Sequence, residues 1–405
     1  MNVLYISYDG LTDTLGRSQV LPYLCGLSDK GHQITVLSCD KPNIYKLENE
    51  KVKQITEENN ILWYSVPYSK KYPIISALHN MRNMKRMAIK LCKENHYQLV
   101  HCRSYMAGSI GLDLKRNFHV KFIFDMRGFF ADERVDGHVW NRKKLIYNLV
   151  YKYFKYKEKQ LQSQADYIVS LTNAGKKVMI EQMHVTTPIE VIPCCADLNH
   201  FSMQNVHEEE KEQLRKELKI NDDDFVISYV GSLGTWYMFS EMMDFVSVLM
   251  QKRAHVKFLI LTPDDRQQII TAAAKYGIKE DSLVIKRVSR EQMPLHIALS
   301  DISIFFIQPV FSKKASSPTK MGELMGMGIP LIVNAGVGDV DEIVADTHCG
   351  IVVKEFNHEN YAQAIDQIDA LLTMDKVLLI QAAQKYYSLE WGVDKYNKIY
   401  NFLNN

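Results

Sequence analysis

The sequence predicts an α/β protein of two domains, each built on a parallel, doubly wound sheet of the Rossmann-like kind. Its 405 residues are too many for one core and suit two domains of roughly 150–200 residues. Short apolar runs alternate with helical patterns in both halves. A charged stretch nearly free of aromatics, residues 204–224, separates the halves as a solvated helix and linker. We therefore expect domains at residues 1–203 and 204–385, followed by an amphipathic helix at 386–405.

In the first half, each predicted strand is a short apolar run bounded by turn residues. The first such run, residues 3–7, ends at the turn Asp9-Gly10. Further strands are expected at residues 34–37, 62–66, 99–102, 122–124, 167–171 and 189–192. Helical patterns cover residues 20–30, 75–94 and 142–163.

The second half repeats the alternation. Strands are expected at residues 225–230, 257–261, 283–286, 302–306 and 329–333, and helices at 240–251, 266–276 and 290–299. Sheets of this kind bind ligands at the C-terminal ends of their strands, so a ligand is expected in a cleft between the two domains.

Composition excludes several classes of protein. A net charge of +2 argues against a general nucleic-acid binder. The first residues lack the features of a signal peptide, and no run approaches the roughly 18 apolar residues of a spanning helix, which predicts a cytoplasmic protein. The seven cysteines form no CxxC pair and the thirteen histidines no HxxxH spacing, so we expect reduced thiols, no metal site and no cofactor.

Two turns in the second half have the composition of phosphate-binding loops. One consists of Ser316 to Lys320, where hydroxyls, backbone N–H groups and one ammonium precede a helix; its candidate contacts are Ser317, Pro318, Thr319 and Lys320. The other follows a strand and is expected to open a helix; it comprises Gly231, Ser232, Leu233, Gly234 and Thr235. Together they could hold a diphosphate, with Lys320 in the role otherwise taken by a metal. The alternatives are an ordinary tight turn and a solvated lysine.

A charged loop of the first half, residues 124–134, is the candidate catalytic site and the candidate binding site for a substrate hydroxyl, here called the acceptor. Asp125, Asp132 and Glu133 are candidate bases or acceptor contacts, and Arg127 is a candidate anion contact. Arg103, which follows another strand, is a second acceptor candidate. The alternative is a surface network of ion pairs.

Residues 316–342 resemble the donor-site signature of family 4 nucleotide-sugar glycosyltransferases of the GT-B fold, and residues 191–201 are similar to their interdomain segment, with Pro193, Asp197 and Phe201 matching. This resemblance implies that Glu323 binds the nucleotide ribose; from its helix position alone, a carboxylate complementing the helix start is equally expected. It also implies that the loop with Gly16, Arg17 and Ser18 lies against the donor phosphate. The C-terminal helix is then expected to cross back to the first domain.

The sequence departs from the family pattern at three positions. Ala315 stands where the family has the first of two glutamates, and Ser232 and Tyr237 stand where it has an arginine and a lysine. Two cationic contacts and one sugar contact are therefore absent. We expect a donor sugar held differently, or a leaving group other than uridine or guanosine diphosphate. Retention at the anomeric carbon, which the resemblance implies, is weakened by the same loss.

The resulting prediction is a metal-independent glycosyltransferase that moves a sugar from a nucleotide-sugar donor to a hydroxyl of a glycan or lipid-linked glycan, in surface polysaccharide or glycoconjugate biosynthesis. The alternatives are a sugar-nucleotide epimerase of the same fold and a non-catalytic partner protein. Basic residues interleave with aromatics over residues 140–159, and a second basic helix covers 82–93. These features suit an anionic membrane surface, and the alternative is a solvated helix face.

Overall fold

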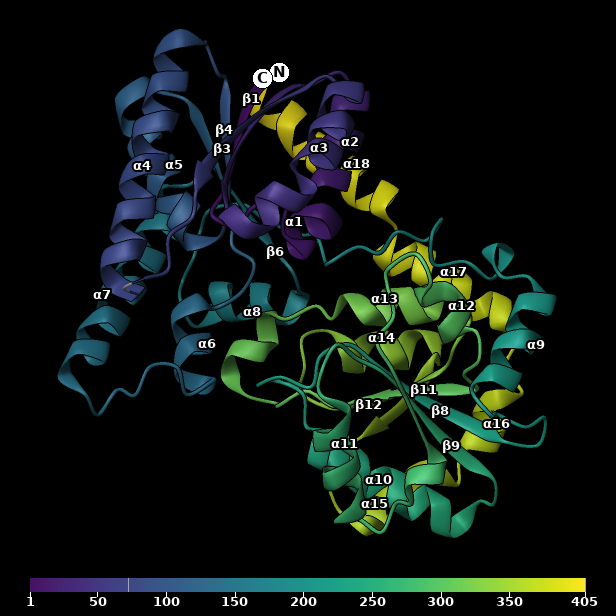
Figure 1. Cartoon of the computed structure of the whole chain (residues 1–405). Coiled ribbons are helices and arrows are strands. Elements are labelled where there is room, and N and C mark those ends of the chain that lie inside the picture. The colour runs from purple at the N-terminus through teal and green to yellow at the C-terminus, as the bar shows by residue number, and fades with distance from the viewer. Residues whose placement is uncertain (72, 405) are drawn as a thin grey trace. The chain divides into compact units, whose positions relative to one another are not determined.

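The computed structural model describes residues 1–71 and 73–404, and the chain divides into two compact units (Figure 1). Unit 1 comprises Met1–Cys194 together with the C-terminal helix α18 (Leu389–Asn404), and unit 2 comprises Cys195–Ser388. Each unit has one parallel sheet with helices on both faces (Figure 1). The predicted two-domain α/β class is confirmed.

Unit 1 contains a seven-stranded sheet in the order β3-β2-β1-β4-β5-β6-β7. Its strands are β1 (Asn2–Ser7), β2 (Gln33–Asp40), β3 (Ile61–Pro67), β4 (Leu99–Arg103), β5 (Lys121–Asp125), β6 (Tyr167–Ser170) and β7 (Ile189–Val191). Besides α18, its helices are α1 (Thr14–Gln19), α2 (Leu21–Asp29), α3 (Pro42–Glu58), α4 (Pro73–Glu94), α5 (Ser104–Phe118), α6 (Phe130–Asp136), α7 (Leu145–Gln164) and α8 (Asn173–Glu181).

Unit 2 contains a six-stranded sheet in the order β10-β9-β8-β11-β12-β13. Its strands are β8 (Phe225–Val230), β9 (Val256–Leu261), β10 (Leu283–Lys286), β11 (Ile302–Phe305), β12 (Leu331–Asn334) and β13 (Gly350–Val353). Its helices are α9 (Glu208–Glu217), α10 (Phe239–Lys252), α11 (Arg266–Ala274), α12 (Met293–Ile297), α13 (Thr319–Gly326), α14 (Val340–Thr347), α15 (His358–Ile365), α16 (Ile368–Leu372) and α17 (Lys376–Tyr387), with short 3-10 turns at η1 (Met203–Asn205), η2 (Glu280–Ser282) and η3 (Phe311–Ala315).

Both sheets are buried on two faces, which explains why their central strands read as continuous apolar runs. Every residue of β8 is buried, and so are Val3–Ser7 of β1. In each sheet the strand order reverses beside the first strand of the unit. The switch points lie between β1 and β4 in unit 1 and between β8 and β11 in unit 2. Ligands bind doubly wound sheets at such points.

The division between the units falls after Cys194, earlier than the expected boundary at residue 203. The segment after Cys194 packs on unit 2: the Ala196 N–H donates to the Tyr387 carbonyl, 2.8 Å away, and Leu198 lies against Gly326. The C-terminal amphipathic stretch is also broken at Ser388, so Tyr387 ends α17 and stays in unit 2. The helix that joins unit 1 is α18.

Several elements were not expected from the sequence, among them α3 and α5 of unit 1 and β13 of unit 2. In α5 the apolar residues are interrupted by Gly108 and Gly111. In the part of the chain that the structure describes, every helix is too short or too polar to cross a lipid bilayer.

Candidate functional site

The strongest candidate site in unit 2 is the surroundings of Lys320, which lies at the switch point of the sheet. Lys320 is in the first turn of α13, as expected, and its side chain turns into the protein, so that only 9% of the residue is exposed. Its Nζ lies 4.4 Å from the ring centroid of Tyr229 in β8 and 5.7 Å from that of Phe305 in β11. A third ring, Tyr237, lies 3.8 Å away.

This ammonium group has no hydrogen-bond partner among the described residues. Aromatic faces attract a cation but do not replace the hydrogen bonds that it makes in water. Burial lowers the pKa of Lys320 to about 7, against a smaller opposing effect of Glu323. At neutral pH the pocket thus holds a lysine poised between its charged and neutral forms, which an anion would convert to the charged form.

Gly231 is required because Lys320 occupies the space where a side chain would project. Its φ is +120°, and a Cβ built on it would lie 2.9 Å from the Lys320 Nζ. The two turns singled out in the sequence therefore meet within unit 2. The prediction that the Gly231 turn opens a helix was wrong. The helix α10 begins only at Phe239, because Tyr237 first forms a bridge with Ile307.

The rest of the Gly231–Thr235 turn is exposed or half-buried. The Leu233 N–H donates to the Asp264 carboxylate at 2.5 Å, so an oxyanion of the protein already binds this backbone group. Ser232, Gly234 and Thr235 are exposed. Gly234 has open space around its Cα and a φ outside the left-handed region, so the backbone does not require glycine there.

The second predicted turn leads directly into α13, and its residues Ser317, Pro318 and Thr319 are half-buried. The helix has no capping side chain, because its N-cap is Pro318. Glu323 lies one turn along the helix, and burial raises its pKa although the Arg290 guanidinium, with its Nη1 3.7 Å away, opposes this.

Two of the three departures from the family pattern have visible consequences here. Ala315 is buried at the end of η3, and the ring of Tyr237 contacts the ammonium of Lys320. A lysine at position 237 would bring a second cation against the first. A further buried lysine was not expected from the sequence: the Lys313 Nζ lies 3.7 Å from the ring centroid of Trp236.

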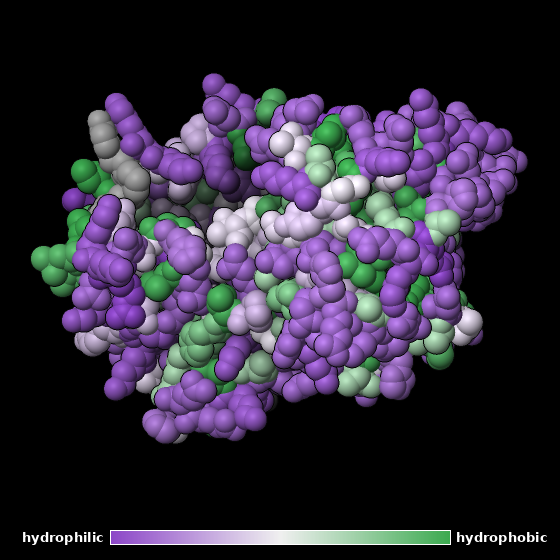
Figure 2. Space-filling model, turned by 90° about the horizontal axis from the view of Figure 1, so that it is seen from below, coloured by the Kyte–Doolittle hydropathy of each residue, from purple (hydrophilic) through white to green (hydrophobic). Residues whose placement is uncertain are grey.

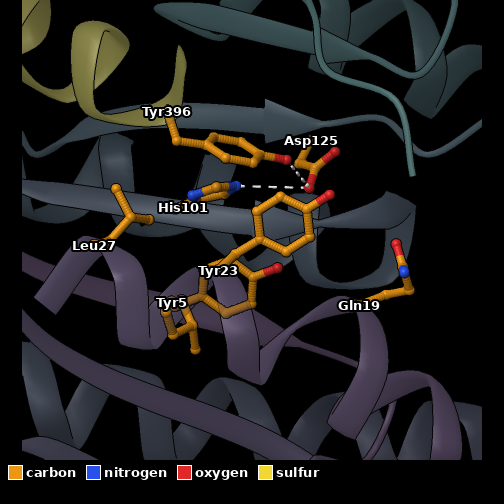
Figure 3. A pocket seen from close by; sticks show the side chains of 8 residues that line it. Tyr5, Gln19, Tyr23, Leu27, His101, Asp125 and Tyr396 are labelled. Carbon is orange, nitrogen blue, oxygen red and sulfur yellow. Dashed lines mark hydrogen bonds and ion pairs between the residues drawn. The ribbon is translucent and has the colours of Figure 1, made fainter. Parts of the chain in front are cut away.

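In unit 1, the predicted catalytic residue Asp125 lies within a buried polar cluster (Figure 3). Tyr396 of α18 donates to its Oδ2 at 3.1 Å, and the His101 Nε2 lies 3.7 Å from the same oxygen. Burial alone would raise the pKa of Asp125, but Arg127 and His101 outweigh it and the pKa is lowered. The adjoining cavity of about 10 Å³ is lined also by Tyr5, Gln19, Tyr23, Leu24 and Leu27.

The sequence had not pointed to His101, Tyr396 or Tyr400. His101 shares a 2.7 Å hydrogen bond between its Nδ1 and the Tyr400 hydroxyl. Burial lowers the pKa of this histidine, which favours the neutral ring. The cluster therefore attaches α18 to the ends of β4 and β5. The only available signal was the amphipathic pattern of the last helix.

The other residues predicted in unit 1 occupy different settings. The Asp132 carboxylate is held by Tyr151 and Lys155, each at 2.8 Å, while Glu133 is half-buried. Arg103 and Arg127 are buried near Asp125. In the first loop, Gly16 packs against the Gly10 carbonyl, Arg17 forms an ion pair with Glu48 at 2.9 Å, and the Ser18 hydroxyl donates to the Thr14 carbonyl.

Within residues 1–71 and 73–404, one group of side chains has the spacing of metal ligands: Asp223, Asp224 and His255, whose ligand atoms lie within 4.8 Å of one another. These residues lie at the N-terminal ends of β8 and β9, whereas Gly231 follows the C-terminal end of β8. This cluster is therefore no part of the candidate site.

Comparison with known families gives the assignment. Residues 210–375 match a model described as glycosyl transferases group 1, and residues 23–200 match one described as glycosyltransferase family 4. The chain belongs to the group 1, family 4 glycosyltransferases. The expected family is confirmed, and the Lys320 pocket lies in the half that matches the group 1 model. Comparison with curated protein sequences finds no match.

Solved structures of other proteins share the fold of this glycosyltransferase at low sequence identity. Sucrose-phosphate synthase from Thermosynechococcus elongatus is 14% identical, with a TM-score of 0.73 over 100% of this chain and 99% of that one. A glycosyltransferase from Rickettsia africae is 16% identical, with a TM-score of 0.71 over 100% and 98%. Anabaena HepE, solved in complex with UDP-glucose, is 13% identical, with a TM-score of 0.69 over 99% of both chains.

Proposed function

We propose that this glycosyltransferase moves a sugar from a nucleotide-sugar donor to a hydroxyl of a glycan or lipid-linked glycan, and that Lys320 contacts the diphosphate of the donor. The observation that carries the proposal is the buried, unpartnered Nζ of Lys320, which lies in the space where a side chain of residue 231 would project. Among the proteins of the same fold, HepE was solved with UDP and with UDP-glucose. A nucleoside diphosphate would supply the charge and the acceptor oxygens that the ammonium lacks.

The same contact explains how catalysis proceeds. As the glycosidic bond to the leaving group breaks, negative charge accumulates on the diphosphate, and a desolvated ammonium stabilises that charge more than water does. We infer that Lys320 takes the role that a divalent metal has in other transferases, so the reaction is metal-independent. Activity unchanged by saturating EDTA is the expected result, and loss of activity that Mg²⁺ or Mn²⁺ restores would contradict it.

The residues of unit 1 favour retention at the anomeric carbon. Inversion requires a base that can reach the acceptor hydroxyl. Of the three predicted bases, Asp125 is only 1% exposed and Asp132 is held by Lys155, so only the half-buried Glu133 remains for an inverting reaction. In the retaining reaction the leaving phosphate itself can take the proton. NMR of the product formed from an α-linked donor tests this: an α-linkage is expected, and a β-linkage would overturn it.

A thermal-shift screen of the full chain against nucleoside mono- and diphosphates tests the donor site. One nucleoside diphosphate should raise the melting temperature of the native protein and leave that of Lys320→Met unchanged. An equal rise in both would remove Lys320 from the site. Product formed from the sugar nucleotide without an acceptor would show an epimerase, and donor binding without turnover on any hydroxyl acceptor would show a non-catalytic partner.

We further propose that unit 1 docks on an anionic membrane from the cytoplasmic side, where a lipid-linked acceptor for surface polysaccharide would be found. Exposed apolar side chains gather at the left edge of Figure 2, the end where Figure 1 places α4 and α7. They include Ile75 and Leu78 of α4 and Leu145, Ile146, Leu149, Tyr153 and Tyr156 of α7. The same helices also carry lysines and arginines, which suits an anionic interface.

Co-sedimentation with vesicles tests this docking. Binding should increase with the fraction of anionic lipid and fall in a Leu145→Ser, Leu149→Ser variant, whereas Leu378→Ser, an exposed leucine of α17, should have no effect. Binding that ignores lipid charge, or that survives the double substitution, would refute the proposal.

A further inference from the structure

Two arginines lie buried at the C-terminal ends of neighbouring strands in unit 1. Arg103 ends β4 and pairs in register with Asp125 at the end of β5, and Arg127 follows two residues later. Their side chains are 5% and 8% exposed. Arg103 also lies at the switch point between β1 and β4, where a doubly wound sheet binds ligands.

The carboxylates that face these two guanidinium groups pair with them only at long distances. Asp125 is the buried carboxylate beside them, and its Oδ1 lies 3.7 Å from the Arg127 Nη1, beyond a good hydrogen bond. The Arg103 Nε lies 3.8 Å from Asp9, whose side chain is half-exposed. His101 in the same cluster is disposed to be neutral, as described above, so the two guanidinium groups have one buried carboxylate, Asp125, and one partly exposed carboxylate, Asp9, as charged partners.

Hydrogen bonding is incomplete as well. The Arg127 Nη2 donates to the Cys194 sulfur, a weak acceptor, at 3.2 Å. Its Nε is buried with no hydrogen-bond partner in the described part of the chain, and the Asp125 Oδ1 is in the same condition. A guanidinium buried without acceptors is unfavourable, and that cost would be offset by an anion bound there.

The backbone around the two arginines is also held in an unusual conformation. Arg127 has a φ of +56° and Ser104, directly after Arg103, a φ of +65°. This left-handed region costs a residue other than glycine about 1 kcal/mol or more, and such residues cluster at ligand sites. Ser104 and Arg127, the two residues with positive φ, therefore lie just past the C-terminal ends of the neighbouring strands β4 and β5.

We propose that Arg103 and Arg127 bind a phosphate group of the acceptor, so that the acceptor is a phosphorylated sugar or lipid. The proposal rests on the transferase function above and narrows its acceptor to an anionic class. A phosphate offers several acceptor oxygens in the geometry that guanidinium groups recognise, and it would supply the acceptor that the Arg127 Nε lacks. The phosphate positions the acceptor and takes no part in the chemical step.

Calorimetric titration of the full-length Lys320→Met protein with inorganic phosphate tests this site apart from the donor site. A single phosphate site is expected to remain in Lys320→Met. Adding Arg127→Met or Arg103→Met should weaken it by at least about tenfold, the loss of a charged hydrogen bond. Arg116→Met, a change at an exposed arginine of α5, should leave it intact. If Arg127→Met fails to fold, Arg127→Lys keeps the charge beside Asp125 but lacks the Nε donor, and the same weakening is expected.

Two competitors identify the source of the phosphate. Displacement of inorganic phosphate by glucose 6-phosphate would support a soluble sugar phosphate as the acceptor. Displacement by dihexanoyl phosphatidylglycerol would support a lipid-linked acceptor. The proposal fails if neither displaces it, if Lys320→Met binds no phosphate, or if binding is the same with and without the arginines. None of these outcomes depends on donor binding, so failure of this proposal would not count against the proposed contact of Lys320 with the donor diphosphate.

Discussion

Asp125 in unit 1 and Lys320 in unit 2 are both buried charged groups at the C-terminal ends of parallel strands, but their surroundings differ. Asp125 has the Tyr396 hydroxyl at 3.1 Å and Arg127 and His101 as charged or polar neighbours. Lys320 has three aromatic rings and no hydrogen-bond partner in the described chain. The carboxylate is thus stabilised by the fold itself, whereas the ammonium weakens the fold until an anion binds. This difference separates a structural charge from a ligand-binding one.

The largest effect is expected on removing the structural charge. Asp125→Ala leaves Arg127 without its carboxylate and should lower the free energy of unfolding by about 3–5 kcal/mol. Denaturant titration at pH 7 measures this. Because the pKa of Asp125 is lowered in the folded protein, its contribution is present at neutral pH and is lost as the pH falls through that lowered value.

The matched control for Asp125→Ala is Asp113→Ala, which removes a surface ion pair with Lys85. Exposed pairs contribute about 0–1 kcal/mol, so the control should change little. Equal effects of the two substitutions would show that Asp125 is not a structural charge.

Substitution of Lys320 is expected to change the free energy of unfolding in the opposite direction. Lys320→Met should raise the free energy of unfolding of the ligand-free protein by on the order of a few kcal/mol at pH 7, because the pKa falls from 10.5 to about 7 on folding. This gain is complete below pH 7 and fades as the pH rises toward the unfolded pKa. Denaturant titration at pH 6 and pH 9 measures both values, and Lys275→Met, an exposed lysine, is the control. A destabilised Lys320→Met protein would contradict the comparison.

A smaller effect is expected at Gly231. Gly231→Ala places a Cβ 2.9 Å from the Lys320 Nζ at a φ of +120° and should lower stability by about 1–3 kcal/mol while weakening donor binding. Gly234→Ala is the control within the same turn, where the space is open. Melting temperatures of both variants measure the change in stability, and titrations with a nucleoside diphosphate measure the change in donor binding. Equal tolerance at the two glycines would mean that Gly231 is only a turn residue.

The smallest effect is expected for Tyr396→Phe, which removes one hydrogen bond to Asp125 and keeps the ring. About 1 kcal/mol of stability should be lost. Denaturant titration beside Asp125→Ala measures the ratio of the two changes. A loss as large as that of Asp125→Ala would assign the stability of the cluster to the attachment of α18, and not to the charge.

The sequence was sufficient for the alternating strands and helices, because both sheets are buried on two faces and their strands are continuous apolar runs. It also placed Lys320 and Gly231 in one pocket, since both follow strands of the same predicted sheet. The aromatic rings around Lys320 were not predictable, because they depend on which strands are neighbours and on the start of α10 at Phe239.

In unit 1 the sequence suggested Asp125 from its neighbours in the chain, but not its role. The hydroxyl that binds it belongs to Tyr396, 271 positions away. Such a contact depends on the return of α18 to the first unit. The buried position of Arg127, two residues after Asp125, was not predictable either. Its φ is positive, and a positive φ at a residue other than glycine cannot be recognised in the sequence.

The most direct test of the role of Lys320 is the number of protons taken up when a nucleoside diphosphate binds. Calorimetry at pH 8 in buffers of different ionisation enthalpy measures it. At this pH Lys320 is mostly neutral and must be protonated to pair with the diphosphate, so uptake should approach about one proton in the native protein and vanish in Lys320→Met. Equal uptake in the two proteins, or equal affinity, would show that the diphosphate does not contact Lys320.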